Sequence, residues 1–167
     1  AHGIQVFDLN QLLTVTTPPV NFTETAHYAG VNSVHNIVID TDSGFAYAVG
    51  SNSSSCGSGL HMVDIRNPLA PTYAGCYSGA GYIHDAQCLT YPGPDTDHIG
   101  KEICITSDVD AIHVVDVTNK AAPVQISTAT YPNPSYIHQS WLTPDNRYMV
   151  LDDELDNSGG EQTNTYI

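Results

Sequence analysis

Apolar and polar residues alternate in short runs along most of this chain, and turn-forming residues separate the runs. Val, Ile, Thr and Tyr dominate the runs, whereas Gly, Pro, Asn, Asp and Ser dominate the breaks. Alternation with a period of two is typical of β-strands that bury one face. No long stretch keeps its apolar positions at helical spacing. The pattern therefore predicts an all-β chain with almost no helix.

One strand-like run occurs three times. Its copies span residues 3–9, 59–65 and 111–117. Asp8, Asp64 and Asp116 stand at the same place in the copies, at intervals of 56 and 52 residues. An Asp side chain can accept backbone N–H groups in the turn that follows it, and a catalytic carboxylate would be needed only once. We therefore predict that these three residues stabilise turns.

A second motif carries a histidine and interleaves with the first. Its copies are Ser33-Val34-His35-Asn36, Tyr82-Ile83-His84-Asp85 and Tyr136-Ile137-His138-Gln139. The histidines are 49 and 54 residues apart, so both motifs share a period of about fifty. Each histidine leads a strand, and a further strand follows at 44–50, 102–108 and 147–153. One period thus contains four strands, with the histidine strand first and the aspartate strand third.

Four strands in about fifty residues are typical of a β-propeller blade. We expect a single all-β domain, 1–167, of β-propeller-type four-stranded blades, about three per chain and cut mid-blade at both termini. The expected segments are third and fourth strands at 3–25, blades at 33–78 and 82–131, first and second strands at 136–156, and a terminal strand at 164–167. A β-sandwich is the alternative, because its strands recur at similar spacing.

The charge balance excludes some partners. The chain has 4 Lys+Arg against 18 Asp+Glu, a formal net charge of −14, which repels polyanions. No apolar run approaches the roughly 20 residues that cross a bilayer. We expect neither nucleic acid as a partner nor insertion into a membrane.

The cysteines predict disulfides. They are even in number, and none has the CxxC spacing of a structural zinc site. Pairing Cys56 with Cys76 and Cys88 with Cys104 keeps each bridge local, and we predict these two bridges. Asn21 and Asn52 each begin an Asn-x-Ser/Thr acceptor for glycans. Disulfides and glycans together predict a secreted, extracellular or cell-surface protein.

Residues 59–156 resemble the LVIVD-repeat proteins called choice-of-anchor B, and the similarity extends more weakly to nearly the whole chain. The motifs are Gly-Leu-His-Met-Val-Asp-Ile, Tyr-Ile-His-Asp-Ala-Gln-Cys, Lys-Glu-Ile-Cys, Val-Val-Asp-Val-Thr-Asn-Lys-Ala-Ala-Pro-Val and Asp-Asp-Glu-Leu-Asp. The resemblance implies a secreted or cell-surface propeller and brings no activity with it. Members of that family run on at both ends, where this chain begins and stops.

The expected strand order predicts an assembly. Third and fourth strands at one end and first and second strands at the other are complementary halves of one blade. Copies of the chain could therefore complete each other head-to-tail, giving a homo-oligomer or filament. Alternatively, the chain is a fragment whose parent supplies the remaining blades.

His35, His84 and His138 are candidate metal ligands, with Asp85 nearby. First strands of propeller blades line the central axis, so matching positions face one another. Imidazoles that converge in this way suit a zinc or copper ion. Alternatively, each histidine fills the same hydrogen-bonding niche at the start of its strand.

An acidic run offers a second candidate metal site. Asp152, Asp153 and Glu154 could bind a calcium ion through carboxylate oxygens, although the run lacks the twelve-residue ligand pattern of a calcium loop. The alternative is a solvated strand end.

These patterns favour a noncatalytic structural or adhesive module. The chain has no Gly-x-Ser-x-Gly elbow and no phosphate-cradling glycine loop. One alternative function is a metal-dependent hydrolase with its site on the propeller axis. Another is a carbohydrate- or protein-binding module that uses the tyrosines and Trp141, although the position of Trp141 in a strand predicts core packing.

Overall fold

The computed structural model describes residues 3–51 and 56–155, which fold into four antiparallel β-sheets. The strands are β1 (Ile4–Val6), β2 (Ala26–Tyr28), β3 (Asn36–Asp40), β4 (Phe45–Val49), β5 (Leu60–Asp64), β6 (Thr72–Tyr77), β7 (Asp85–Thr90), β8 (Glu102–Ser107), β9 (Ile112–Asp116), β10 (Val124–Ala129), β11 (Ile137–Leu142) and β12 (Met149–Asp153). A 3-10 helix, η1 (Leu9–Thr14), follows β1. The all-β prediction is confirmed.

Two four-stranded sheets lie between two smaller ones. We call β1–β2 sheet 1, β3–β6 sheet 2, β7–β10 sheet 3 and β11–β12 sheet 4. In sheets 2 and 3 each strand pairs with the next along the chain, as the fifty-residue period predicts. Sheet 4 contains the predicted first and second strands.

The N-terminal part differs in detail from the prediction. The partner of β1 is β2, which begins at Ala26, just beyond the predicted range 3–25. Helix η1 was not expected, because six residues are too few to show a helical period. The predicted strand at 164–167 lies outside the described residues.

The recurring aspartates stabilise turns, as predicted. In each copy, Oδ1 of the aspartate accepts the backbone N–H of the residue two positions later. The distances are 3.0 Å for each of Asp8, Asp64 and Asp116. The three carboxylates therefore do the same structural work in three successive sheets.

The four sheets pack in series, so sheets 2 and 3 bury both faces. Between them lies the largest apolar cluster, of Tyr47, Val49, Leu60, Met62, Tyr77, Ile83, Ala86, Cys88, Cys104, Val115 and Val117. Sheet 1 covers the other face of sheet 2 through Ile4, Tyr28 and Val31. Sheet 4 covers part of the other face of sheet 3 through Ile137, Leu142, Met149 and Leu151. Burial of apolar surface on both faces is the main stabilising term of this fold.

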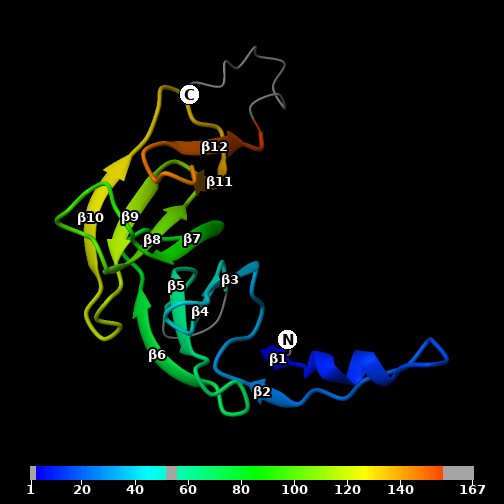
Figure 1. Ribbon diagram of the computed structural model, residues 1–167. Helices are drawn as coiled ribbons and strands as arrows, with labels where there is room; N and C mark the ends of the chain where they lie inside the picture. The colour runs from blue at the N-terminus through cyan, green and yellow to red at the C-terminus, as the bar shows by residue number, and fades with distance from the viewer. Residues whose placement is uncertain (1–2, 52–55, 156–167) are drawn as a thin grey trace.

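The first strands of successive sheets are neighbours. Strand β7 contacts both β3 and β11, and Figure 1 shows these three strands on one side of the molecule, with β6 and β10 on the other. The strand orders are linear, and the described sheets do not close into a ring or barrel. No helix in residues 3–51 and 56–155 is long and apolar enough to span a membrane.

Both predicted disulfides are present. Cys56 pairs with Cys76, with a Cα–Cα distance of 5.4 Å, and ties the start of β5 to β6. Cys88 pairs with Cys104, which is its cross-strand neighbour in β8, with a Cα–Cα distance of 4.1 Å. Two disulfides indicate an oxidising compartment.

Trp141 lies in β11, as expected, but it is 52% exposed, so the prediction that it packs in the core is wrong. Its neighbours Ser140 and Leu142 point to the buried face of sheet 4, because successive side chains of a strand alternate. Sheet 4 is therefore covered on one face only within the described residues.

Glu102 is a buried link between sheets 2 and 3. Its Oε1 accepts hydrogen bonds from Ser43, at 2.6 Å, and from the hydroxyl of Tyr47. Its Oε2 lies 2.5 Å from Nζ of Lys120. Burial raises the pKa of Tyr47, and the hydrogen bond to Glu102 raises it further, so this hydroxyl stays protonated and donates.

The substitution Glu102→Gln tests this link. We expect it to lower the free energy of unfolding by about 3 kcal/mol, because Lys120 would lose the carboxylate that compensates its buried charge. Urea denaturation monitored by circular dichroism measures the effect. The control Asp64→Asn removes the exposed ion pair with Arg66 but keeps an Oδ1 that can accept the backbone N–H of Arg66, so it should change stability little. Equal effects of the two variants would contradict the assignment.

A second buried pair lies within sheet 3. The carboxylate of Asp108 is 2.7 Å from Nδ1 of His113, and the Asp108 side chain is only 1% exposed. Burial raises the pKa of Asp108 to about 6, although His113 favours the ionised form. Folded protein therefore binds the Asp108 proton more tightly than unfolded protein does.

This raised pKa predicts a pH effect. Between about pH 4 and pH 6 the folded state holds more protons at Asp108 than the unfolded state, so this residue makes the free energy of unfolding fall as pH rises. Asp108→Asn should remove that decline and gain about 2 kcal/mol relative to wild type between pH 4 and pH 7. Urea unfolding at each pH measures it.

Asp145→Asn is the matched control for Asp108→Asn. Hydrogen bonds from Thr143 and from the backbone of Arg147 hold the pKa of Asp145 below its ordinary value. Its contribution therefore has the opposite sign, and this variant should lose stability relative to wild type as pH rises. A flat difference curve for Asp108→Asn would refute the buried-carboxyl interpretation.

Candidate metal centre

The structure brings the three repeated histidines side by side. The ring centroids of His35 and His84 are 4.0 Å apart, and those of His84 and His138 are 4.6 Å apart. His84, in the middle, also meets the ring of Tyr136 edge-on at 5.2 Å. Side chains that are about fifty residues apart in sequence thus form one cluster beside the first strands of sheets 2, 3 and 4.

Backbone pairing fixes each histidine at the start of its strand. The N–H of His35 donates to the carbonyl of Val49 at 3.0 Å, and the N–H of His84 donates to that of Ser107 at 2.8 Å. His138 lies in β11, next to a bulge between Ile137 and Gln139. These histidines occupy matching positions because the sheets repeat one pairing pattern.

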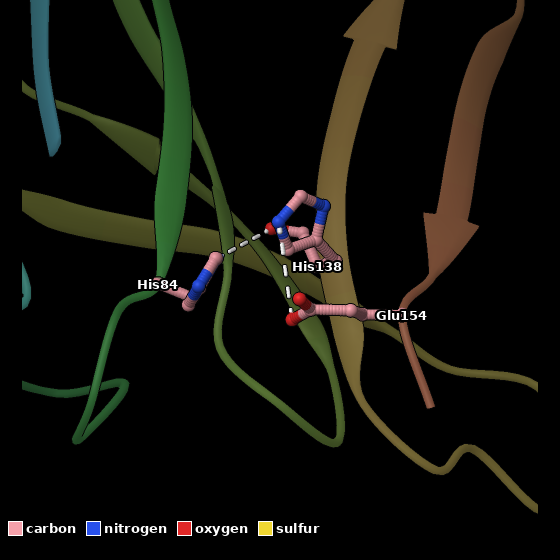
Figure 2. A group of neighbouring side chains, drawn as sticks. All are labelled: His84, His138 and Glu154. Carbon is pink, nitrogen blue, oxygen red and sulfur yellow. Dashed lines mark hydrogen bonds and ion pairs between the residues drawn. The ribbon is translucent and has the colours of Figure 1, made fainter. Parts of the chain in front are cut away.

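His84 and His138 form a potential metal site with Glu154. One ligand atom from each of the three residues lies within 4.8 Å of the others. Figure 2 shows Glu154 facing the ring of His138, with His84 beside them. Nε2 of His138 is 4.0 Å from Oε2 of Glu154. Two atoms that bind one tetrahedral zinc ion lie about 3.3 Å apart, so a small movement would bring Glu154 and His138 to the spacing of zinc ligands.

The outer hydrogen bonds suit metal binding. Nδ1 of His84 lies 3.0 Å from the backbone carbonyl of His138, which requires this nitrogen to carry the proton and leaves Nε2 with the lone pair. Nδ1 of His138 lies 3.2 Å from Oδ2 of Asp152. Metal-binding histidines usually donate their second N–H to a carbonyl or carboxylate in this way, which fixes the ring and its tautomer.

His84 is available as a neutral ligand. It is 6% exposed, and burial lowers its pKa more than the carbonyl of His138 raises it. The nearby imidazoles of His35 and His138 lower the pKa further. A metal ion binds the neutral imidazole, so the lowered pKa removes competition from protons near neutral pH.

Two of the predicted ligands lie outside this group. The ring of His35 packs against that of His84 at a tilt of 46°, but His35 does not join the three residues whose ligand atoms converge. Asp85 is buried, and its carboxylate accepts from its neighbour Ala86 at 2.7 Å and from Nε2 of Gln139 at 2.9 Å. The structure thus uses Asp85 to join β7 to β11, because consecutive residues of a strand point to opposite faces.

The acidic run divides between different partners. Asp152 accepts the N–H of Gln139 and faces His138. Asp153 accepts from Tyr131, Ser135, Tyr136 and Leu155. Within residues 3–51 and 56–155, Asp152, Asp153 and Glu154 do not form a group of converging ligand atoms. Alternation along β12 separates the carboxylates that the calcium hypothesis places together.

Glu154 was placed in the calcium hypothesis, and its position beside the histidines was not foreseen. The signal was present in the strand pattern. In an antiparallel pair, the end of the second strand lies next to the start of the first, so residues just after β12 approach His138 in β11. The N–H of Glu154 indeed donates to the carbonyl of Tyr136 at 3.0 Å.

Of the two candidate glycan acceptors, Asn21 is exposed in the segment between η1 and β2. Asn52 lies outside the described residues. An exposed asparagine satisfies the steric requirement for a glycan.

Comparison with family models and curated proteins does not assign this chain to a family. Neither the protein-family models nor the curated protein sequences contain a match to this chain.

Proposed function

We propose that this chain is a noncatalytic extracellular module of β-propeller type that binds a zinc or copper ion through His84, His138 and Glu154. The observation that carries the proposal is the convergence of these three ligand atoms within 4.8 Å. The oriented Nδ1 atoms of both histidines support it, because they leave the Nε2 lone pairs free for a metal.

The donor set favours zinc or copper over calcium. Two imidazoles and one carboxylate suit borderline transition metals, whereas calcium takes six to eight oxygen ligands. The ligands come from two sheets, because His84 directly precedes β7 of sheet 3, while His138 lies in β11 and Glu154 directly follows β12 of sheet 4. A bound ion would therefore join the two sheets as well as occupy the site.

The propeller arrangement is part of the proposal. The contacts of β7 with β3 and β11 and the close packing of the three histidine rings at the starts of these strands support a common axis along the first strands. The LVIVD-repeat resemblance agrees with such blades, and the two disulfides agree with secretion. The hydrolase alternative would require water at the fourth position of the ion, and it stays a prediction.

Titration with zinc chloride tests the metal site. We expect calorimetry to show one zinc ion per chain and the melting temperature to rise, because an ion that binds only folded protein stabilises it by about 2.7 kcal/mol at a free concentration 100 times Kd. His84→Ala and Glu154→Gln should weaken binding at least tenfold, since each removes a ligand.

His27→Ala is the matched control. His27 is exposed and pairs with Glu24 at 3.0 Å in sheet 1, away from the three ligands. This variant should bind zinc as the wild type does. If zinc changes neither heat nor melting temperature at saturation, or if His27→Ala and His84→Ala weaken binding equally, the proposed site is wrong.

A further inference from the structure

An apolar groove lies on the face of sheet 3 that sheet 4 covers only in part. Its volume is about 260 Å³, and its apolar lining is Ile103, Ile105, Val114, Ile126 and Leu142. Tyr91 and Asn146 are among the polar residues that line it. The groove is open because sheet 4 has two strands within the described residues, whereas sheet 3 has four.

Sheet 2 shows what covers such a face when the next sheet is complete. The positions in sheet 2 that match Ile103, Ile105, Val114 and Ile126 are Phe45, Tyr47, Met62 and Ala74. These residues belong to one apolar cluster with Val115 and Val117, from the third strand of sheet 3 and the residue after it. The third strand of the following sheet therefore helps to cover this face, together with residues of its first two strands such as Ala86, Cys88 and Cys104.

The same rule holds one sheet earlier. Val63 and Ile65, which match Val115 and Val117, pack toward sheet 1. The matching residues at the N-terminal end are Phe7, directly after β1, and Leu9, the first residue of η1. Both are apolar, yet they are 43% and 70% exposed. Phe7 and Leu9 thus match side chains that pack on the preceding sheet in the other two repeats. Sheet 3 has an open groove of the type on which they would pack.

The strand edges agree with this match. Within the described residues, β12 pairs only with β11 and β1 pairs only with β2, so each has one unpaired edge. In complete sheets the second and third strands pair at Tyr47↔Met62 and at Ile105↔Val114. The corresponding residues are Val150 in β12 and Val6 in β1. Unpaired edges readily take up another strand.

We propose that β1 of a second copy of this chain pairs with the free edge of β12, with Val6 opposite Val150, and places Phe7 and Leu9 in the groove of sheet 3. In this contact two strands from each chain complete one four-stranded sheet. The contact is head-to-tail, so it generates either a closed ring or an open filament. This inference is independent of metal binding, because it uses none of the three ligands.

Mass measurement by light scattering after size-exclusion chromatography tests the proposal. Wild type should have a mass at least twice the 17.9 kDa of one chain. Raising the salt concentration should strengthen the assembly, because screening weakens repulsion between chains of net charge −14. Phe7→Ser/Leu9→Ser should have the mass of one chain while keeping the circular dichroism spectrum of wild type, since both side chains are exposed within one copy.

Leu13→Ser is the matched control, because Leu13 is an 84% exposed leucine of the same helix with no counterpart in the repeat contact. It should assemble as wild type does. The proposal is overturned if wild type stays at the mass of one chain at every concentration. This outcome includes the case in which residues of the same chain fill the groove. Assembly that survives Phe7→Ser/Leu9→Ser also overturns it.

Cysteine cross-linking tests the register. Val6→Cys/Val150→Cys should give covalent dimers and longer species under mild oxidation, because β1 and β12 of one chain lie at opposite ends of the molecule (Figure 1). Val6→Cys/Tyr148→Cys places the second thiol two residues away along β12 and should cross-link at least fivefold less. Equal yields for both variants would refute the proposed register.

Discussion

The constraint on which this structure depends is that each four-stranded sheet is apolar on both faces. Tyr47 and Met62 face sheet 3, whereas Ala46 and Val63 of the same strands face sheet 1. A sheet of this kind cannot fold alone, because the uncovered face would leave its apolar side chains in water. The sheets must therefore stack in series. The stack in turn decides which residues of different repeats become neighbours.

Stacking turns a repeated residue into a cluster. One histidine at the start of a strand has no special chemistry, but the first strands of sheets 2, 3 and 4 lie next to one another, so His35, His84 and His138 meet. The repeat alone does not make the site. His84 and His138 gain Glu154 because β12 ends beside the start of β11. A residue outside the repeated motif thus distinguishes one histidine pair from the other.

The sequence predicted the structure correctly where the repeated motifs determine it. Its period predicted the strand order of sheets 2 and 3 and the aspartate turns, because equivalent strands pair in equivalent registers. The even number of cysteines and the preference for local pairing predicted both disulfides. The prediction failed where the type of a residue was considered without its position in the repeat. Trp141 looked like a core residue, yet its position matches Gln87, which faces the next sheet, so it is exposed. Asp85, which was predicted near the metal ligands, accepts a hydrogen bond from Gln139 in β11.

Sheet 4 contributes residues to both the proposed metal site and the open groove, so the stability of sheet 4 limits both. A two-stranded sheet is marginal in water unless other elements hold it. Here Ile137 packs on Ile105 and Ile112, and the carboxylate of Asp153 fixes the segment that enters β11. These contacts place His138 and Glu154 beside His84. The packing that buries one face of sheet 4 therefore also positions the free edge of β12 for the proposed strand pairing, and it positions His138 and Glu154 for the proposed metal site.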